Sequence, residues 1–284
     1  MKERYIATLE GCARGDTLGM PVEGWKRGRI QKVFGKIREP IDAVILYDEH
    51  ENEITNDEFG ELKYWSRGRK RGEYTDDTIL TLALARSIVA KKGIDIRDIA
   101  RRQVHEYKIR LQPDGTVRGG FGKTTMEAFK RLDQGVSPYE SGVIGGPGNA
   151  PAMKMSPVGL WMERSDAYDQ GLRDAEDIGR MTHLDPRSIV SGVVQAHAVY
   201  AALSDVPREA FVSSLADVAK QWERPVSKEY PLAEKGSLAS RLEWITQQRD
   251  TDPDTVHRRV QSSSDVISSY PFALFMFQRY WDDP

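Results

Sequence analysis

The pattern of apolar and polar positions along the chain follows mainly the 3.6-residue period of α-helices. From Tyr5 to about Leu18 apolar side chains recur at helical spacing, and from Ile79 to Val89 the sequence is apolar nearly all round. A segment of the second kind is typical of a buried helix. We therefore expect both segments to be helices that lie in the core.

Helix-start signals mark further helices. Asp95 stands at the N-cap position of one predicted helix, and Asp185-Pro186 supplies the N-cap and first residue of another over 187–203. The helical pattern continues in three later segments. The shared face after Asp95 is formed by Ile96, Ile99, Gln103, Tyr107 and Leu111, and the later segments are 206–222, 237–248 and 271–280.

Strand signals are weak and confined to one region. The stretches AVILYDEH (43–50) and ELKYWSR (61–67) flank a polar segment, and together they predict at most one hairpin. No internal repeat and no low-complexity linker divides the chain. The sequence therefore predicts an all-α fold in a single domain over 1–284, with a small β-hairpin insert near residues 43–67.

The charge of the chain is balanced. Lys plus Arg number 41 and Asp plus Glu number 43, a net charge of -2. This balance gives no general attraction to nucleic acid, so a polyanionic partner has to be held by local groups. The single cysteine, Cys12, excludes an internal disulfide, and no apolar run has the length of a signal peptide or a membrane span. We expect a soluble, cytoplasmic protein without a membrane partner, in which Cys12 is a small buried thiol.

Two adjacent carboxylates stand between two threonines in Thr75-Asp76-Asp77-Thr78, at the start of the predicted buried helix. In the first turn of a helix both acids can project toward one point beyond the helix end. Oxygen donors grouped in this way suit Mg²⁺ or Mn²⁺. The other interpretation is structural: Thr75 or Asp76 is the N-cap and the acids complement the helix dipole. These four residues alone leave both interpretations open.

Two further acids, Asp16 and Glu23, flank the glycine and proline that end the first predicted helix. A carboxylate on such a loop is a candidate general acid or base, although an ordinary exposed glutamate explains Glu23 equally well. His183, directly before the helix at 187–203, is the histidine we single out as either a ligand contact or a helix-junction residue. The five histidines show no zinc-binding spacing.

Two glycine-rich loops complete the set of candidate functional motifs. RGGFGKTT (118–125) is similar to an anion-binding turn that leads into a helix, but it lacks the Walker A spacing, and a glycine C-cap before a new helix is an equal alternative. GPGNAPAMKMSP (146–157) places Asn149 on a loop, with Met153 and Met155 predicted to face the core.

The order of the motifs is more specific than any one of them. GDTLGMPVE, YTDDT, GGFGKTT, GNAPAMKMSP and THLDPRSIVSGVVQAHA together resemble the ADP-ribosylglycohydrolase family, which includes the dinitrogenase reductase-activating glycohydrolase. The resemblance implies a compact all-α domain with a binuclear Mg²⁺ or Mn²⁺ site. It also implies hydrolysis of the bond between C1″ of an ADP-ribosyl group and its acceptor, in an ADP-ribosylated protein or small molecule.

Position by position, the resemblance implies a role for each motif. It makes Glu23 the catalytic acid near the scissile ribose. The implied metal ligands are Thr75, Asp76 and Asp77, and the implied substrate-binding residues are Gly120, Gly122 and Lys123 at the diphosphate, Gly148 and Asn149 at the distal ribose and phosphates, and His183 near the substrate.

The chain departs from the family pattern in three places. Ala150 and Lys154 stand where the family usually has Gly and Arg. The family's C-terminal GGDTDT-like metal motif is missing, and Asp282 and Asp283 in the final YWDDP lack its spacing, so we do not take them as ligands. The domain is therefore expected to be C-terminally incomplete or naturally variant. The sequence therefore allows two functions: a metal-dependent hydrolase with reduced activity, or a non-catalytic ADP-ribose-binding or structural member of the family.

The 26–74 segment lies between Glu23 and Asp76 in the sequence. We expect it to form a flap that selects the acceptor.

Overall fold

The computed structural model describes residues 1–229 and 236–282. Over these residues the chain forms thirteen α-helices, one short 3-10 helix and one two-stranded sheet, which confirms the all-α prediction. None of the described helices is both long and apolar enough to cross a membrane. The first elements are α1 (Lys2–Gly19), η1 (Met20–Val22), α2 (Arg27–Phe34), β1 (Asn56–Asp57), β2 (Gly60–Glu61), α3 (Asp76–Lys91), α4 (Ile96–Lys108) and α5 (Lys123–Asp133). The later elements are α6 (Ala150–Lys154), α7 (Ser156–Ser165), α8 (Tyr168–Arg180), α9 (Pro186–Leu203), α10 (Arg208–Glu229), α11 (Leu238–Thr246), α12 (Pro253–Val260) and α13 (Val266–Arg279).

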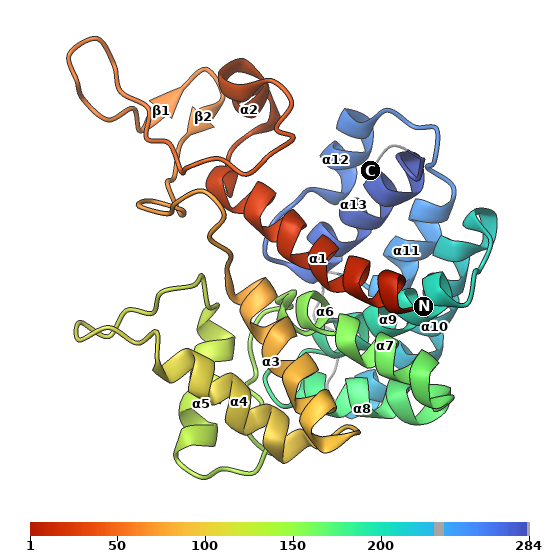
Figure 1. Ribbon diagram of the computed structural model, residues 1–284. Coiled ribbons are helices and arrows are strands. Elements are labelled where there is room, and N and C mark those ends of the chain that lie inside the picture. Colours follow the sequence, from red (N-terminus) through yellow and green to blue (C-terminus); the bar gives the residue numbers. More distant parts are fainter. Residues whose placement is uncertain (230–235, 283–284) are drawn as a thin grey trace.

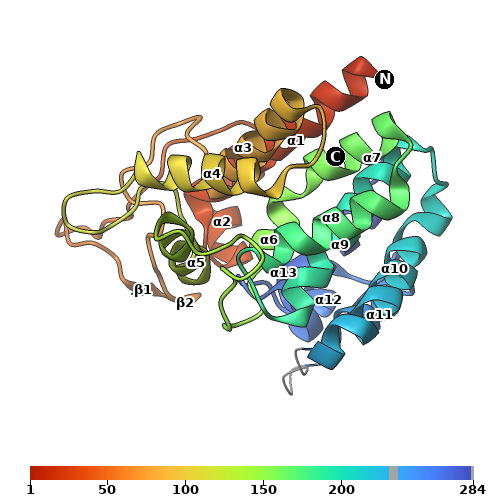
Figure 2. The same ribbon diagram turned by 90° about the horizontal axis from the view of Figure 1, so that it is seen from below.

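Helix α9 is the central element of the larger core. Its sequence is apolar or small on every face, and almost all of its side chains are buried. Helices α6, α7, α8 and α10 pack along it, with α11 and α13 also in contact (Figure 2). The predicted start is confirmed: Pro186 is the first helical residue, and the Asp185 carboxylate accepts a hydrogen bond from the Arg187 amide at 2.9 Å.

Helices α3, α4 and α5 form a second group at one side of the molecule (Figure 1). Their small core contains Leu80 and Phe129, both fully buried. The prediction that α3 is buried holds for most of its length, but Val89 near its end is 78% exposed. On α4, Asp95 is the N-cap as predicted. The predicted face is buried except for Leu111, which lies beyond the helix end and is 44% exposed.

Helix α1 confirms the helix predicted from Tyr5 to about Leu18, but the prediction that this helix lies in the core is wrong. It runs across the outside of the molecule and packs on α3 and α7 (Figure 1). Among its residues only Thr17 is buried, and Ile6 is 44% exposed, because the helix has just one face turned toward the protein. Cys12 is accordingly only half-buried, with its Sγ 3.7 Å from Thr81 Oγ1.

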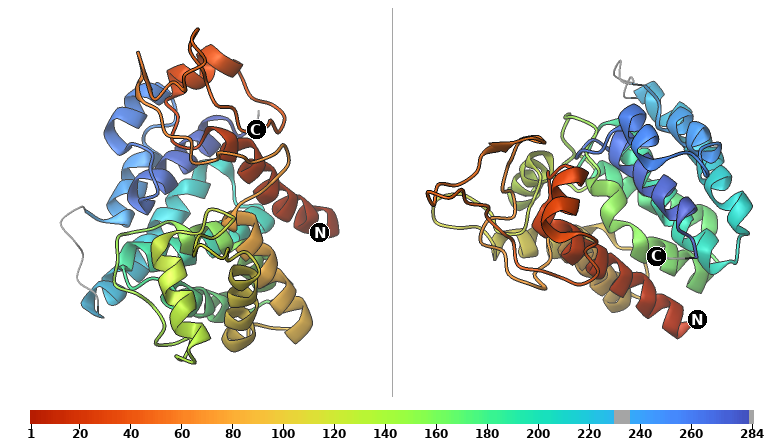
Figure 3. Two further views of the ribbon diagram at one scale, coloured as in Figure 1. Left: turned by 90° about the vertical axis from the view of Figure 1, so that its left-hand side faces the viewer. Right: turned by 90° about the horizontal axis from the view of Figure 1, so that it is seen from above.

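The 26–74 segment extends from one end of the helical body and is mostly irregular (Figure 3). A hairpin lies in the expected region, but its strands are β1 and β2, with Asn56 paired to Glu61. The stretch 43–50 makes only an isolated bridge, between Tyr47 and Glu53, so the predicted pairing of 43–50 with 61–67 does not form. Instead the buried Arg29 guanidinium ties α2 to the hairpin through two hydrogen bonds to Asp57, at 2.7 and 2.6 Å.

The predicted C-terminal helices are present with shifted ends. Helix α13 begins at Val266 rather than Pro271, because Asp265 caps it by accepting a hydrogen bond from the Ile267 amide at 3.0 Å, and Pro271 lies inside the helix. Of the two terminal acids, Asp282 is exposed and pairs with Arg208, while Asp283 lies outside the described residues. The helices predicted at 206–222 and 237–248 correspond to α10 and α11.

Candidate active site

The first turn of α3 is held by a side chain from a distant part of the sequence. Asp16 of α1 accepts hydrogen bonds from the amides of Thr75 and Thr78, at 2.8 and 3.2 Å, and from their hydroxyls, at 2.9 and 2.7 Å. Thr75 is the N-cap by position but makes no side-chain cap of its own. The structural interpretation is therefore right about the position of Thr75, but the side chain that binds amides at the helix end is that of Asp16.

Asp76 and Asp77 follow this cap without a cationic partner in direct contact. Asp76 is 7% exposed, and among the described residues no other residue donates a hydrogen bond to its carboxylate. The Thr75 hydroxyl lies 3.0 Å from Asp77 Oδ2. Burial, and then the charge of Asp77, raise the pKa of Asp76 well above its ordinary value. Burial, followed by the Asp16 charge, raises the pKa of Asp77 to about 6.

Glu23 lies directly after η1, and its charge contributes to the raised pKa values of Asp76 and Asp77. Its side chain is exposed, yet desolvation by the surrounding protein raises its own pKa, an effect that Arg69 opposes and Asp16 reinforces. Four acids thus come together from two separate segments of the sequence.

The loop that carries Glu23 is anchored by the 26–74 segment. The Ser66 hydroxyl donates to the Pro21 carbonyl at 3.0 Å. The Trp65 ring lies so close to Gly24 that a Cβ there would meet it at 2.8 Å, and Gly24 has φ +80°. Trp65 itself is 65% exposed. The insert therefore contacts the residues on either side of Glu23, and the flap role stays a prediction.

The first glycine-rich loop lies against the acids. The Asp76 amide donates to the Gly119 carbonyl at 2.6 Å. A Cβ on Gly120 would lie 3.2 Å from Asp76 Oδ1, and Gly120 has φ +86°, so this close approach requires glycine. Gly122 is the N-cap position of α5, and Lys123 is its first residue and exposed.

The second glycine-rich loop joins the first to His183. Gly145 packs on Thr124 in the first turn of α5, where a Cβ would lie 2.9 Å from its Oγ1. A Cβ on Gly148 would lie 2.9 Å from His183 Nε2. The Asn149 amide donates to the Ser264 carbonyl at 3.2 Å, so the loop also contacts the segment before α13. These contacts connect Gly145 to the start of α5 and Gly148 to His183.

The donor set decides which ion this region could hold. Thr75, Asp76 and Asp77 offer hard oxygen donors, and no cation among the described residues is in direct contact with the buried Asp76 or the half-buried Asp77, which fits a divalent cation such as Mg²⁺ or Mn²⁺. Asp16 is already engaged by Thr75 and Thr78. Within residues 1–229 and 236–282 no group of three or more His, Cys, Asp or Glu side chains is arranged as a metal site.

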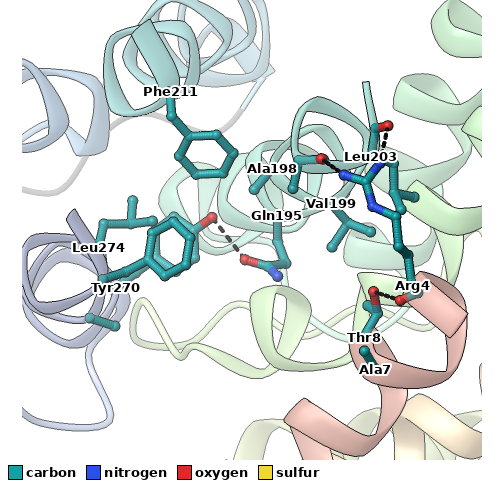
Figure 4. Close-up of a pocket in the computed structure, with 13 residues that line it drawn as sticks. Arg4, Ala7, Thr8, Gln195, Ala198, Val199, Leu203, Phe211, Tyr270 and Leu274 are labelled. Atoms are coloured by element: carbon teal, nitrogen blue, oxygen red, sulfur yellow. Dashed lines mark hydrogen bonds between the residues drawn. The ribbon is translucent and has the colours of Figure 1, made fainter. Parts of the chain in front are cut away.

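A pocket of about 530 Å³ lies away from these acids, between α1, α9, α10 and α13 (Figure 4). Its lining is mainly apolar, and its one charged residue, Arg4, donates hydrogen bonds to the carbonyls of Ala202 and Leu203. The Tyr270 hydroxyl likewise donates to Gln195 at 3.0 Å. The polar groups of this pocket satisfy one another, so it lacks the unpaired acids of the site on α3.

Sequence reasoning missed the roles of Asp16 and Lys154. An aspartate inside a helix is an unfavourable choice, and that signal marks Asp16 as a residue with a tertiary partner. Lys154, between two methionines, is fully buried, and lysine is almost never buried unless it is paired. Its ammonium lies near enough to Asp76 for the carboxylate to raise its pKa, but burial is the larger effect and lowers the pKa to about 7.

Fold and site together define a helical protein with an acidic centre bordered by two glycine-rich loops. A family model described as ADP-ribosylglycohydrolase matches residues 1–284, and the chain belongs to that family. The uncharacterized protein YegU of Escherichia coli (strain K12) is 26% identical over 284 residues, which cover 99% of this chain and 79% of that protein. ADP-ribosylhydrolase ARH3 of Gallus gallus is 31% identical over 225 residues, 75% of this chain and 54% of that protein. A solved structure titled "ADP-ribosylglycohydrolase-related protein complex" shares the fold, with a TM-score of 0.60 and 22% identity over 100% of this chain and 77% of the other.

Proposed function

We propose that the protein is a metal-dependent hydrolase that releases ADP-ribose from ADP-ribosylated proteins or small conjugates by cleaving the bond at C1″. The observation that carries the proposal is the group formed by Asp16, Glu23, Asp76 and Asp77, in which Asp76 is buried, Asp77 is half-buried, and the charge of Asp77 raises the pKa of Asp76. Such a group is costly in a folded protein unless a ligand makes use of it. Family membership supports the same reaction class.

The side chains divide into ion-binding and catalytic roles. Thr75, Asp76 and Asp77 would hold Mg²⁺ or Mn²⁺, which would supply binding and orientation of the ribose hydroxyls. Glu23 is the one acid of the group that is exposed, and desolvation raises its pKa, the direction that suits a general acid or base. We assign Glu23 as general acid or base, and the ion-binding role to the three residues of α3.

The reaction balances with water as the only co-reactant. The bond from C1″ to the acceptor nitrogen or oxygen breaks, and its electron pair stays with the acceptor. A water oxygen bonds to C1″, one water proton is taken up by base, and the acceptor receives a proton. Positive charge develops at C1″ in an oxocarbenium-like transition state, which neighbouring carboxylates stabilise.

The glycine-rich loops fit the remaining substrate. Gly122 and Lys123 lie at the start of α5, where the N-terminal amides of the helix and the lysine favour a diphosphate, and Gly120 lies against Asp76 beside them. Gly148, Asn149 and His183 border the same region. Local donors of this kind allow a chain with net charge -2 to bind a dianion.

The test is release of free ADP-ribose from conjugates on arginine, on serine and on a small-molecule ester, assayed with Mg²⁺ and with EDTA. Metal-dependent release is expected, and the conjugate that is cleaved identifies the acceptor. The matched control is Asp98→Asn, which alters a buried aspartate outside the site. Release that is equal in EDTA would reject the metal-dependent mechanism.

One observation favours a second candidate, an ADP-ribose-binding protein without turnover. Among the residues that the structure describes, the carboxylates do not form a complete metal site. Binding of ADP-ribose without release from any conjugate, in Mg²⁺ and in Mn²⁺, would support this alternative over hydrolysis.

A further inference from the structure

A chain of buried polar side chains runs from α4 through the end of α6 to the segment before α9. Gln103, Lys154 and Thr182 are fully buried, and His183 is 3% exposed. The Lys154 ammonium donates to Gln103 Oε1 at 3.4 Å and to Thr182 Oγ1 at 3.5 Å, and Thr182 Oγ1 lies 3.0 Å from His183 Nδ1. Burying so many polar groups is unfavourable unless each hydrogen bond has a defined donor and acceptor.

The direction of these hydrogen bonds follows from the donors. In both contacts of Lys154 its nitrogen is the donor. Gln103 donates its amide to the Leu80 carbonyl at 3.4 Å, which leaves its oxygen to accept from Lys154. The Thr182 hydroxyl also accepts from Lys154, so its single proton goes to another acceptor. The acceptors in range are the Gly179 carbonyl at 3.5 Å and His183 Nδ1 at 3.0 Å, and the shorter contact is to the histidine.

This arrangement decides where the imidazole proton lies. When Nδ1 accepts from Thr182, the ring proton must be on Nε2. The charge state agrees, because burial and the nearby Lys154 ammonium lower the pKa of His183 to about 3, so the ring is neutral at pH 7. Nε2 faces Gly148, and among the described residues none accepts a hydrogen bond from it.

We propose that Lys154 and Thr182 are positioning residues that fix His183 as a neutral imidazole protonated on Nε2. This N–H is a donor that the folded protein keeps free for a ligand oxygen at the Gly148 loop. The ligand part rests on the proposed function and assigns that oxygen to bound ADP-ribose. Lys154 thus acts on the ligand through Thr182 and His183.

The tautomer can be measured on the ligand-free full chain. Long-range ¹⁵N–¹H correlation spectra of ¹⁵N-labelled protein distinguish the two neutral tautomers and the imidazolium, and His183→Asn assigns the signal. We expect the neutral form protonated on Nε2 at pH 7. The Thr182→Val variant should lose this preference and Thr182→Ser should keep it. An imidazolium or an Nδ1-protonated ring in the wild type would overturn the proposal, with no dependence on how any variant folds.

The ligand part is tested by calorimetric titration with ADP-ribose. Loss of one oriented hydrogen bond should weaken binding about tenfold in Thr182→Val and Lys154→Met. Thr182→Ser and Lys154→Arg, which retain the donors, should stay close to wild type. Equal affinity of wild type and Thr182→Val would overturn the ligand part. No binding by the wild type, with the Nε2 tautomer intact, would instead reject the proposed function and leave the tautomer assignment standing.

Discussion

Two neighbouring helices, α3 and α4, each carry a buried aspartate in the first turn, and the two aspartates are in opposite electrostatic situations. Asp76 on α3 is 7% exposed and Asp98 on α4 is 6% exposed. Asp98 accepts hydrogen bonds from Arg101, Arg102 and Ser87. Burial would raise its pKa, but these donors outweigh burial and hold the pKa well below its ordinary value.

Asp76 lacks such donors, and its pKa moves the other way. The comparison shows that burial alone does not say what a carboxylate is for. An acid that stabilises the fold has its counter-charges within the fold, whereas an acid without them gains a compensating charge only when a ligand binds. We therefore expect changes at Asp98 to affect stability, and changes at the acids of α3 to affect ligand binding and turnover.

The largest effect is expected from Asp77→Ala. This change removes one of two carboxylates available to a cation, so metal-dependent release of ADP-ribose and stabilisation by added Mg²⁺ or Mn²⁺ should both be lost. Thermal stability in EDTA should not fall, since few contacts depend on this side chain and its ionised form destabilises the metal-free fold. The opposite result would be unchanged stabilisation by metal together with a large fall in melting temperature in EDTA. Asp77 would then be a structural residue, and it would no longer differ from Asp98.

Glu23→Gln should lower turnover by about 10² to 10⁴-fold, the usual contribution of a general acid or base. ADP-ribose affinity should remain nearly intact, because the amide keeps the size of the side chain and removes only its proton exchange. Steady-state kinetics and calorimetric titration measure the two quantities separately. An equal loss of both would assign Glu23 to binding or structure.

Asp98→Asn should reduce the free energy of unfolding by about 2 kcal/mol, because hydrogen bonds from two guanidinium groups lose their charged acceptor. Chemical denaturation measures the change. Turnover per folded molecule should match the wild type, and a specific loss of turnover would show that Asp98 belongs to the site after all.

The pH dependence of stability should separate the two kinds of acid in metal-free protein. Asp77 has a folded-state pKa raised to about 6, so its ionised form destabilises the fold above that pH, and the penalty disappears as pH falls toward the ordinary value. The stability difference between Asp77→Asn and wild type should therefore shrink from pH 8 to pH 4. Asp98 has a lowered pKa, so its contribution is complete above the ordinary value and is lost only in stronger acid.

The difference between Asp98→Asn and wild type should thus stay flat from pH 8 to pH 5. Parallel denaturation series in EDTA measure both differences. Two flat curves would contradict the assignment of a raised pKa to Asp77.

The smallest effect is expected from shortening the tip at 48–52. The insert contacts the Glu23 loop through Trp65 and Ser66, so a change at its exposed tip should alter the relative rates on different acceptors by a few-fold. ADP-ribose affinity serves as the control and should be unchanged. Identical acceptor preference before and after the deletion would end the flap hypothesis.

Local sequence determined much of this protein because caps and periodic apolar faces act over a few residues. The N-caps Asp95 and Asp185, the buried α3 and α9, and the all-α class all follow from such short-range patterns. The ordered motifs also predicted the family to which the chain belongs. The hairpin register in 43–67 did not follow: the strands that pair are Asn56–Asp57 and Gly60–Glu61, and this short hairpin is bound by Arg29 from outside the predicted segment.

Only the tertiary structure decided what the charges do. The sequence alone does not show that Asp16 of α1 caps α3, because the two segments lie 59 to 62 residues apart. Nor does it show that Asp98 is neutralised by arginines while Asp76 is not. The position of α1 on the surface and the direction of the hydrogen bonds through Lys154 are likewise set by packing. Burial and charge pairing depend on which segments meet in space, and those long-range contacts are not encoded in any short pattern.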